Sequence, residues 1–90
     1  FSISQNYPNP FNPITNINYS ISTKAFVTMK VYNLLGQKIT ELVSRNTAPG
    51  QYSVNWDGTN QSGEQIPSGI YIYSIDTGKF QSSKKMVLMK

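Results

Sequence analysis

The chain has 90 residues without cysteine or histidine, so one domain with a thin core has to form without disulfides or a zinc site built from those ligands. Catalysis by histidine or cysteine is excluded, and four acidic residues are a small stock for acid–base chemistry, so we do not expect an enzyme. The net charge is +4, but the basic residues are spread along the chain and gather only towards its end, which favours solvated strand ends over a nucleic-acid site.

Residues 1–13 are predicted to form an irregular lead-in that packs on the domain that follows, residues 14–90. Three prolines interrupt this segment: Pro8, Pro10 and Pro13. Residues before proline are pushed towards extended geometry, and Asn-Pro steps initiate turns, so no helix is expected here. Tyr7 and Phe11 are its apolar anchors, and we expect both to lie across one open end of the core.

The rest of the chain alternates apolar and polar residues with a period of two, the pattern of strands that face water on one side. Predicted strands cover residues 17–21, 27–32, 38–43, 52–56, 70–75 and 80–90. Apolar residues also recur at helical spacing within 34–43, but Gly36 and Thr40 weaken that alternative, and the strand is favoured. About seven short strands in a chain of this length predict an all-β, immunoglobulin-like antiparallel β-sandwich.

The loop at residues 57–63 is rich in side chains that either ligate hard cations or close turns. Asp57, Asn60 and Glu64 offer oxygen ligands for Ca²⁺, but their spacing does not match the twelve-residue calcium loop, and only two of them are carboxylates. Asx-turn chemistry explains the same residues and is the favoured interpretation, so no metal or other cofactor is predicted. Asp57 and Asp76 are not expected to form a catalytic pair, because no histidine or cysteine supports one.

Aromatic side chains offer a second kind of candidate site. Trp56, Tyr52, Tyr71 and Tyr73 would form a stacking platform for sugars if all four were exposed. The chain would then be a carbohydrate-binding or structural accessory module of a multidomain hydrolase, which is the alternative function. Trp56 shares a strand face with Val54, however, and a small sandwich often buries one tryptophan, so we expect Trp56 in the core.

The chain closes with a basic, then apolar, then basic segment. Lys84 and Lys85 precede the apolar residues 86–89, and Lys90 follows them. Lysines on a final strand discourage edge-to-edge pairing, which is a purely structural explanation. The functional alternative is a tail that a partner reads through main-chain pairing or through its charge. The residues alone leave both explanations open.

Six motifs, taken in order, resemble the type A C-terminal sorting domain of the type IX secretion system. They are NYPNPFNP with the following ITNI (6–17), VYNLLGQK (31–38), PGQY (49–52), WDG (56–58), SGIY (68–71) and KKMVLMK (84–90). Together they extend over nearly the whole chain. The middle motifs also resemble the immunoglobulin-like domain of flagellar hook-capping proteins, a relation that concerns the fold more than the function.

The resemblance implies an immunoglobulin-like sandwich at the C-terminus of cargo proteins that Bacteroidetes secrete. Such a domain is recognised by the outer-membrane secretion machinery after the cargo has entered the periplasm, and in many members a sortase-like cysteine protease then removes it. The cargo ends at the cell surface or in the medium. The resemblance places recognition on Gly69, Tyr71, Lys84, Lys85, Met86, Val87 and Lys90. Its structural positions are Pro8, Pro10, Phe11, Pro13, Gly36, Trp56, Asp57 and Gly58.

Two further expectations concern the setting of the domain. No transmembrane segment is predicted, because no apolar run approaches the ~20 residues that cross a bilayer. The sequence opens on Phe1 without a secretory signal, so we expect a segment of a longer protein with a cargo domain upstream.

Overall fold

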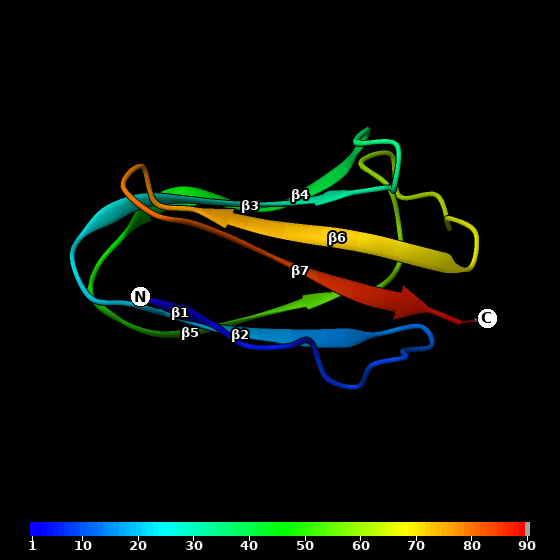
Figure 1. Cartoon of the computed structure of the whole chain (residues 1–90), viewed down its shortest axis with the longest axis horizontal. Helices are drawn as coiled ribbons and strands as arrows, with labels where there is room; N and C mark the ends of the chain where they lie inside the picture. Colours follow the sequence, from blue (N-terminus) through cyan, green and yellow to red (C-terminus); the bar gives the residue numbers. More distant parts are fainter. Residues whose placement is uncertain (90) are drawn as a thin grey trace.

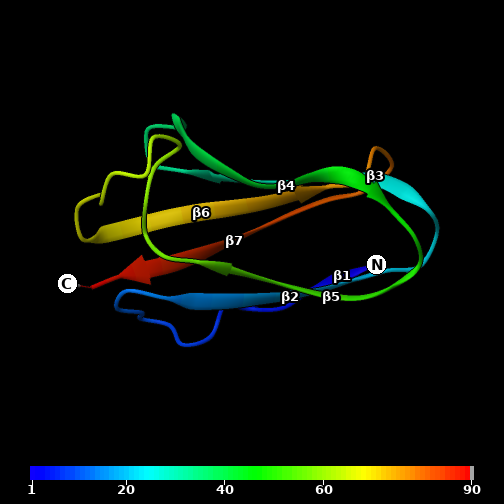
Figure 2. The ribbon, with the colours of Figure 1, turned by 180° about the vertical axis from the view of Figure 1, so that it is seen from behind.

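The alternation of apolar and polar residues becomes strands over most of residues 1–89, the part of the chain that this computed structural model describes. Seven strands form there: β1 (Ser2–Ile3), β2 (Thr15–Ile21), β3 (Ala25–Tyr32), β4 (Lys38–Thr47), β5 (Gly50–Trp56), β6 (Gly69–Asp76) and β7 (Gln81–Leu88). One sheet has the order β1-β2-β5 and the other β4-β3-β6-β7, and the two face each other as layers (Figures 1 and 2). The predicted all-β antiparallel sandwich is confirmed.

The core lies between the two sheets and is filled by every second residue of β2, β3, β6 and β7. These buried residues are Ile17, Tyr19, Ile21, Val27, Met29, Val31, Tyr71, Tyr73, Ile75, Met86 and Leu88. Burial of apolar surface stabilises the sandwich by roughly 25 cal/mol for each Å² removed from water. At one end of the core the Trp56 ring lies 5.6 Å from the ring of Phe11 and 6.0 Å from that of Tyr71, measured between centroids. The prediction that Trp56 belongs to the core is therefore confirmed.

Strand β4 is four residues longer than predicted and follows a side-chain turn. Asn33 closes this turn, because its Oδ1 accepts hydrogen bonds from the Leu35 and Gln37 amides at 2.9 and 3.0 Å. Gly36 takes a φ of +83° there, which L side chains rarely adopt. The helical alternative for 34–43 is thereby excluded. The added residues 44–47 are mostly polar, because β4 is an edge strand, and pairing with β3 holds them in register.

The lead-in begins on one sheet and ends on the other. Ser2 pairs with Ser20 of β2, and further along the backbone of Phe11 forms a parallel bridge with Leu88 of β7. Phe11 is buried, as predicted, but the prediction was wrong for Tyr7, whose side chain is 80% exposed. Tyr7 pairs through its backbone with Asn16, which leaves its ring in solvent.

The direction of the strands fixes which groups can meet. The N-terminus lies at the end of the sandwich where β6 turns into β7, and the Phe1 and Phe80 rings are 5.4 Å apart there. From that end the lead-in and β7 both run to the opposite end (Figure 1). Asp57 follows the end of β5 and Asp76 closes β6, and these two strand ends point to opposite ends of the sandwich. The two carboxylates therefore do not meet.

Candidate recognition surface on the last strand

The Gly-x-Tyr motifs form tyrosine corners, in which a tyrosine hydroxyl binds the backbone a few residues upstream. The Tyr71 hydroxyl donates to the carbonyl oxygen of Pro67 at 2.8 Å, and Tyr52 donates to that of Ala48 at 2.6 Å. Tyr71 is buried, and burial raises the pKa of its hydroxyl. Tyr71 and the neighbouring Gly69 therefore position the start of β6, and the Tyr71 side chain offers no surface to a partner.

Strand β7 splits the other predicted recognition residues between two faces. Met86 and Leu88 point into the core and are 0% and 1% exposed, whereas Lys85 is exposed and Val87 is half-buried on the outer face. Lys84 is half-buried on the inward-facing side, at the edge of the sheet. Met86 therefore holds the strand in place rather than forming a contact surface. Lys90 lies outside the described residues.

The outer edge of β7 is covered by the lead-in through four hydrogen bonds. The Phe11 amide donates to the Val87 carbonyl and the Met89 amide to the Phe11 carbonyl, each at 2.9 Å. The Asn9 Oδ1 accepts from the Val87 amide at 2.9 Å, and the Gln5 Nε2 donates to the Lys85 carbonyl at 2.7 Å. Main-chain pairing of residues 85–89 with a partner strand is therefore blocked while the lead-in is in place.

Sequence reasoning missed the polar residues that hold the lead-in in place. Asn6 is 2% exposed, and its Nδ2 donates to the Thr15 Oγ1 at 2.9 Å and to the Pro8 carbonyl at 3.2 Å. The prolines themselves stay on the surface: Pro8, Pro10 and Pro13 are all exposed. The polar residues between them looked like turn formers, and only their partners on distant strands reveal their role.

The charge on β7 is the accessible part of the predicted recognition set. Lys84 and Lys85 have no carboxylate within ion-pair distance in the described part of the chain, where the one salt bridge joins Lys38 and Glu41 at 3.8 Å. An ammonium group without an ion-pair partner in the fold is available to attract an incoming anion. The recognition role stays a prediction, and within residues 1–89 Lys84, Lys85 and Val87 are the members whose side chains reach the surface.

The WDG motif is a turn that fits β5 against β7. Gly58 has a φ of +75°, and a Cβ placed on it would lie 3.4 Å from Cδ2 of Leu88. The Trp56 Nε1 donates to the Thr59 carbonyl at 3.0 Å, and the Asp57 carboxylate accepts from the Thr59 hydroxyl at 2.6 Å. These contacts give the motif a structural role.

Asx-turn hydrogen bonds shape the loop whose side-chain oxygens were considered as Ca²⁺ ligands. The Asn60 Oδ1 accepts hydrogen bonds from the amides of Ser62 and Glu64, both at 3.0 Å, which confirms the turn interpretation. The Asn60 Nδ2 donates to the Glu64 carboxylate at 3.1 Å. Within residues 1–89, no group of three acidic, histidine or cysteine side chains is placed to hold a metal ion.

The aromatic platform proposed for sugars does not form. Trp56, Tyr71 and Tyr73 are 3%, 6% and 0% exposed, and burial raises the pKa of the Tyr73 hydroxyl. Tyr52 is half-buried and stacks on Tyr19 with 5.5 Å between ring centroids. The carbohydrate alternative loses the feature on which it rested.

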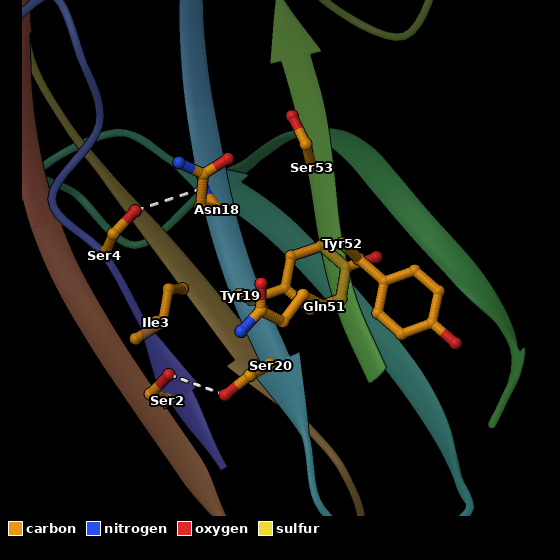
Figure 3. A pocket seen from close by; sticks show the side chains of 9 residues that line it. All are labelled: Ser2, Ile3, Ser4, Asn18, Tyr19, Ser20, Gln51, Tyr52 and Ser53. Atoms are coloured by element: carbon orange, nitrogen blue, oxygen red, sulfur yellow. Dashed lines mark hydrogen bonds between the residues drawn. The ribbon is translucent and has the colours of Figure 1, made fainter. Parts of the chain in front are cut away.

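A shallow hollow of about 570 Å³ lies over the three-stranded sheet. Figure 3 shows the side chains around it: Ser2, Ile3, Ser4, Asn18, Tyr19, Ser20, Gln51, Tyr52 and Ser53. Two of the hydrogen bonds are internal, since Ser2 and Ser20 share one at 2.7 Å and the Ser4 hydroxyl accepts from the Asn18 amide at 3.0 Å (Figure 3). The lining carries no charged side chain, and its serine, asparagine and glutamine side chains offer hydrogen-bond donors and acceptors.

Helices long and apolar enough to cross a membrane are absent from residues 1–89.

Two proteins from one organism are among the solved structures that share this fold. One is dimeric latent PorU from Porphyromonas gingivalis, with a TM-score of 0.71 and 19% sequence identity over 94% of this chain. The other is PorZ from the same organism, described as an essential bacterial surface component of its type-IX secretion system, with a TM-score of 0.67 and 20% identity over 96% of this chain. The chain corresponds to 9% of the PorU chain and 11% of the PorZ chain.

Comparison of sequences adds a family. No curated protein matches the chain. The model of the FlgD Ig-like domain matches residues 14–79, which is 66 of the 90 residues and includes β2 to β6. The chain therefore belongs to the FlgD Ig-like domain family.

Proposed function

We propose that this chain is the C-terminal sorting domain of a larger secreted protein, which it directs through the type IX secretion system to the cell surface or the medium. The observation that carries the proposal is that Lys84 and Lys85, on the last strand of the sandwich, have no ion-pair partner within residues 1–89. The ordered motifs along the chain and the fold shared with PorZ, a surface component of such a system, support it.

The proposed mechanism is non-covalent docking, in which the domain catalyses no reaction. The folded domain presents its outer surface near β7 to the outer-membrane machinery, while the cargo precedes Phe1. Association of charged surfaces is fast and specific because complementary charge steers the encounter. Where a sortase-like protease processes the cargo, the domain is the part that is removed.

A transplant experiment tests this function. The 90-residue chain is fused behind a periplasmic reporter enzyme in a bacterium that has the secretion system and in a strain without its outer-membrane pore. We expect the reporter outside the first strain and inside the periplasm of the second. Equal amounts outside both strains, or none outside either, would contradict the proposal.

A substitution in the tail tests its charge without disturbing the core. Truncation before Lys85 is expected to leave the reporter in the periplasm, but it also removes the buried Met86 and Leu88. Lys85→Ala, at an exposed position on the outer face, leaves these side chains in place and is expected to lower export several-fold, because an ion pair with the machinery is lost. Lys24→Ala, an equal loss of charge in an exposed turn, is the control and is expected to be exported like the unmodified fusion.

A further inference from the structure

An apolar patch lies on the outer face of the four-stranded sheet, where β6 begins. The register places Tyr32 of β3 beside Ile72 of β6, and Ile70 of β6 beside Val87 of β7. Side chains directly opposite on paired strands share a face, and so do residues two apart on one strand. These four residues, which we term the Ile72 patch, therefore form one surface, on the side of the sheet away from the buried Tyr71 and Tyr73.

Within residues 1–89, no other element packs over this patch. Ile70 is 43% exposed, and Tyr32, Ile72 and Val87 are half-buried. The other sheet lies on the opposite side of this one in both views (Figures 1 and 2). Contiguous apolar residues on the outside of a small domain mark an interaction surface more often than isolated ones do.

Lysines surround the patch on three sides. Lys85 lies directly opposite Ile72, Lys38 directly opposite Tyr32, and Lys30 two residues before Tyr32 on the same strand. Glu41 is the nearby carboxylate, opposite Lys30 and 3.8 Å from the ammonium of Lys38. Asp76 shares the face but lies at the other end of β6, where its Oδ1 accepts from the Gly78 amide. The patch thus has an apolar centre and a rim of three lysines against one carboxylate.

This charge distribution selects the kind of partner. A second copy packed on the same face about a two-fold axis would bring lysine rims together, which opposes pairing of the chain with itself. A protein surface with an apolar centre and carboxylates around it is complementary in both respects. We infer that the Ile72 patch docks on an acidic protein surface of the export machinery, an inference that rests on the proposed function and names the surface it uses.

Export of the reporter fusion tests the rim with charge-matched variants. The pair Lys30→Glu and Lys85→Glu reverses two rim charges, and the pair Lys24→Glu and Lys79→Glu makes the same change in net charge at the opposite end of the sandwich. We expect the rim pair to lower export by about tenfold and the control pair by less than about twofold. Thermal melting of both purified variants within a few degrees of the unmodified chain shows that they fold. Equal export of the two variants overturns the inference.

Photocrosslinking identifies the protein that contacts the apolar centre of the Ile72 patch. A benzophenone amino acid at position 72 of the fusion is expected to form one adduct with an envelope protein through an acidic segment, and the adduct is expected to disappear in the rim pair but not in the control pair. An adduct that persists in the rim pair, or that involves a segment without carboxylates, overturns the inference.

Two further measurements test whether a lipid surface or a second copy of the chain binds the Ile72 patch instead. Flotation with phosphatidylglycerol vesicles is expected to show no binding of the purified chain, and binding that the rim pair abolishes overturns the inference in favour of a lipid surface. Sedimentation is expected to give a monomer, and a dimer that Ile72→Ser dissociates overturns it in favour of a second copy.

Failure of this inference differs from failure of the proposed function. If the unmodified fusion is exported and the rim pair is exported equally well, the function stands and the docking surface lies elsewhere. If the unmodified fusion is not exported at all, the proposed function fails, and this inference fails with it.

Discussion

Tyr73 joins β6 to the lead-in through a single hydroxyl group. The Tyr73 ring is fully buried. Its hydroxyl donates a hydrogen bond to the Ser4 carbonyl at 2.7 Å and accepts one from the Asn6 amide at 2.9 Å. A buried backbone amide needs a partner, because an unsatisfied donor in the interior costs about 1–3 kcal/mol. One side chain on β6 thereby fixes the path of the lead-in between the two sheets.

Tyr73→Phe removes this hydroxyl and keeps the ring. We expect the free energy of unfolding to fall by about 1–3 kcal/mol, because the Asn6 amide is left buried without a partner. Urea unfolding followed by tryptophan fluorescence measures the loss. Tyr32→Phe is the control, since Tyr32 is half-buried and its hydroxyl has no hydrogen-bond partner among residues 1–89. A loss of equal size in both variants would contradict this role for Tyr73.

The same hydroxyl makes stability depend on alkaline pH. Burial raises the pKa of Tyr73 and Tyr71 above the ordinary value of 10.0, and the Asn6 amide lowers that of Tyr73 in part. Because the folded state holds these protons more tightly than the unfolded state, their contribution is complete below the ordinary pKa and is lost as pH rises through the raised values.

Urea midpoints between about pH 8 and about pH 11 check this dependence. We expect the midpoint to fall as pH rises above the ordinary pKa, and to fall less steeply in Tyr73→Phe, which has one buried phenol fewer. A midpoint that rises over this range, or an unchanged slope in the variant, would sink the argument.

At the scale of elements, the lead-in acts as a partial extra strand on the edge of β7. Asn9 mimics a backbone carbonyl when its Oδ1 accepts from the Val87 amide, and Phe11 continues the pairing with its own backbone. An unpaired edge strand is a template for association, so this cover limits pairing with other chains.

Asn9→Ala is expected to open the edge locally. The Val87 amide loses its acceptor, which we expect to cost about 1 kcal/mol and to speed hydrogen exchange at that amide. Amide exchange followed by NMR measures the effect. Asn12→Ala serves as the control, because Asn12 is exposed and makes no side-chain hydrogen bond within residues 1–89. Unchanged exchange at Val87 would show that the lead-in does not depend on Asn9.

The strands and their buried faces could be predicted from the sequence, but the covering of the β7 edge by the lead-in could not. Trp56 was placed correctly because its spacing from Val54 is local information, and the turn at Asn60 follows from its own side chain. Contacts such as Phe11 with Val87 join residues far apart in the chain, so no local pattern encodes them. Met86 was assigned to recognition by the resemblance alone, and the structure shows that its side chain is buried in the core.

At the scale of the whole molecule, the two outer faces differ in chemistry. The hollowed face over β2 and β5 carries neutral serine, asparagine and glutamine side chains, whereas the opposite face carries the Ile72 patch and its lysines. Each strand alone shows only an alternation of polar and apolar residues, and the sheet pairing decides which polar residues gather. The candidate surface was therefore predictable only in part: Lys85 and Val87 belong to the predicted recognition set, whereas the other rim lysines and the rest of the apolar centre do not.

The parallel run of the lead-in beside β7 also has a mechanical consequence. A force that pulls Phe1 and Met89 apart acts along the strands, so the bonds of Phe11 to Val87 and Met89 are loaded together in shear. A force applied between Gly69 and Leu88, which lie opposite each other on β6 and β7, opens that pair one bond at a time. Single-molecule stretching is expected to need the larger force in the first geometry, and equal forces would refute it. Traction along its length is thus the load that the domain resists best.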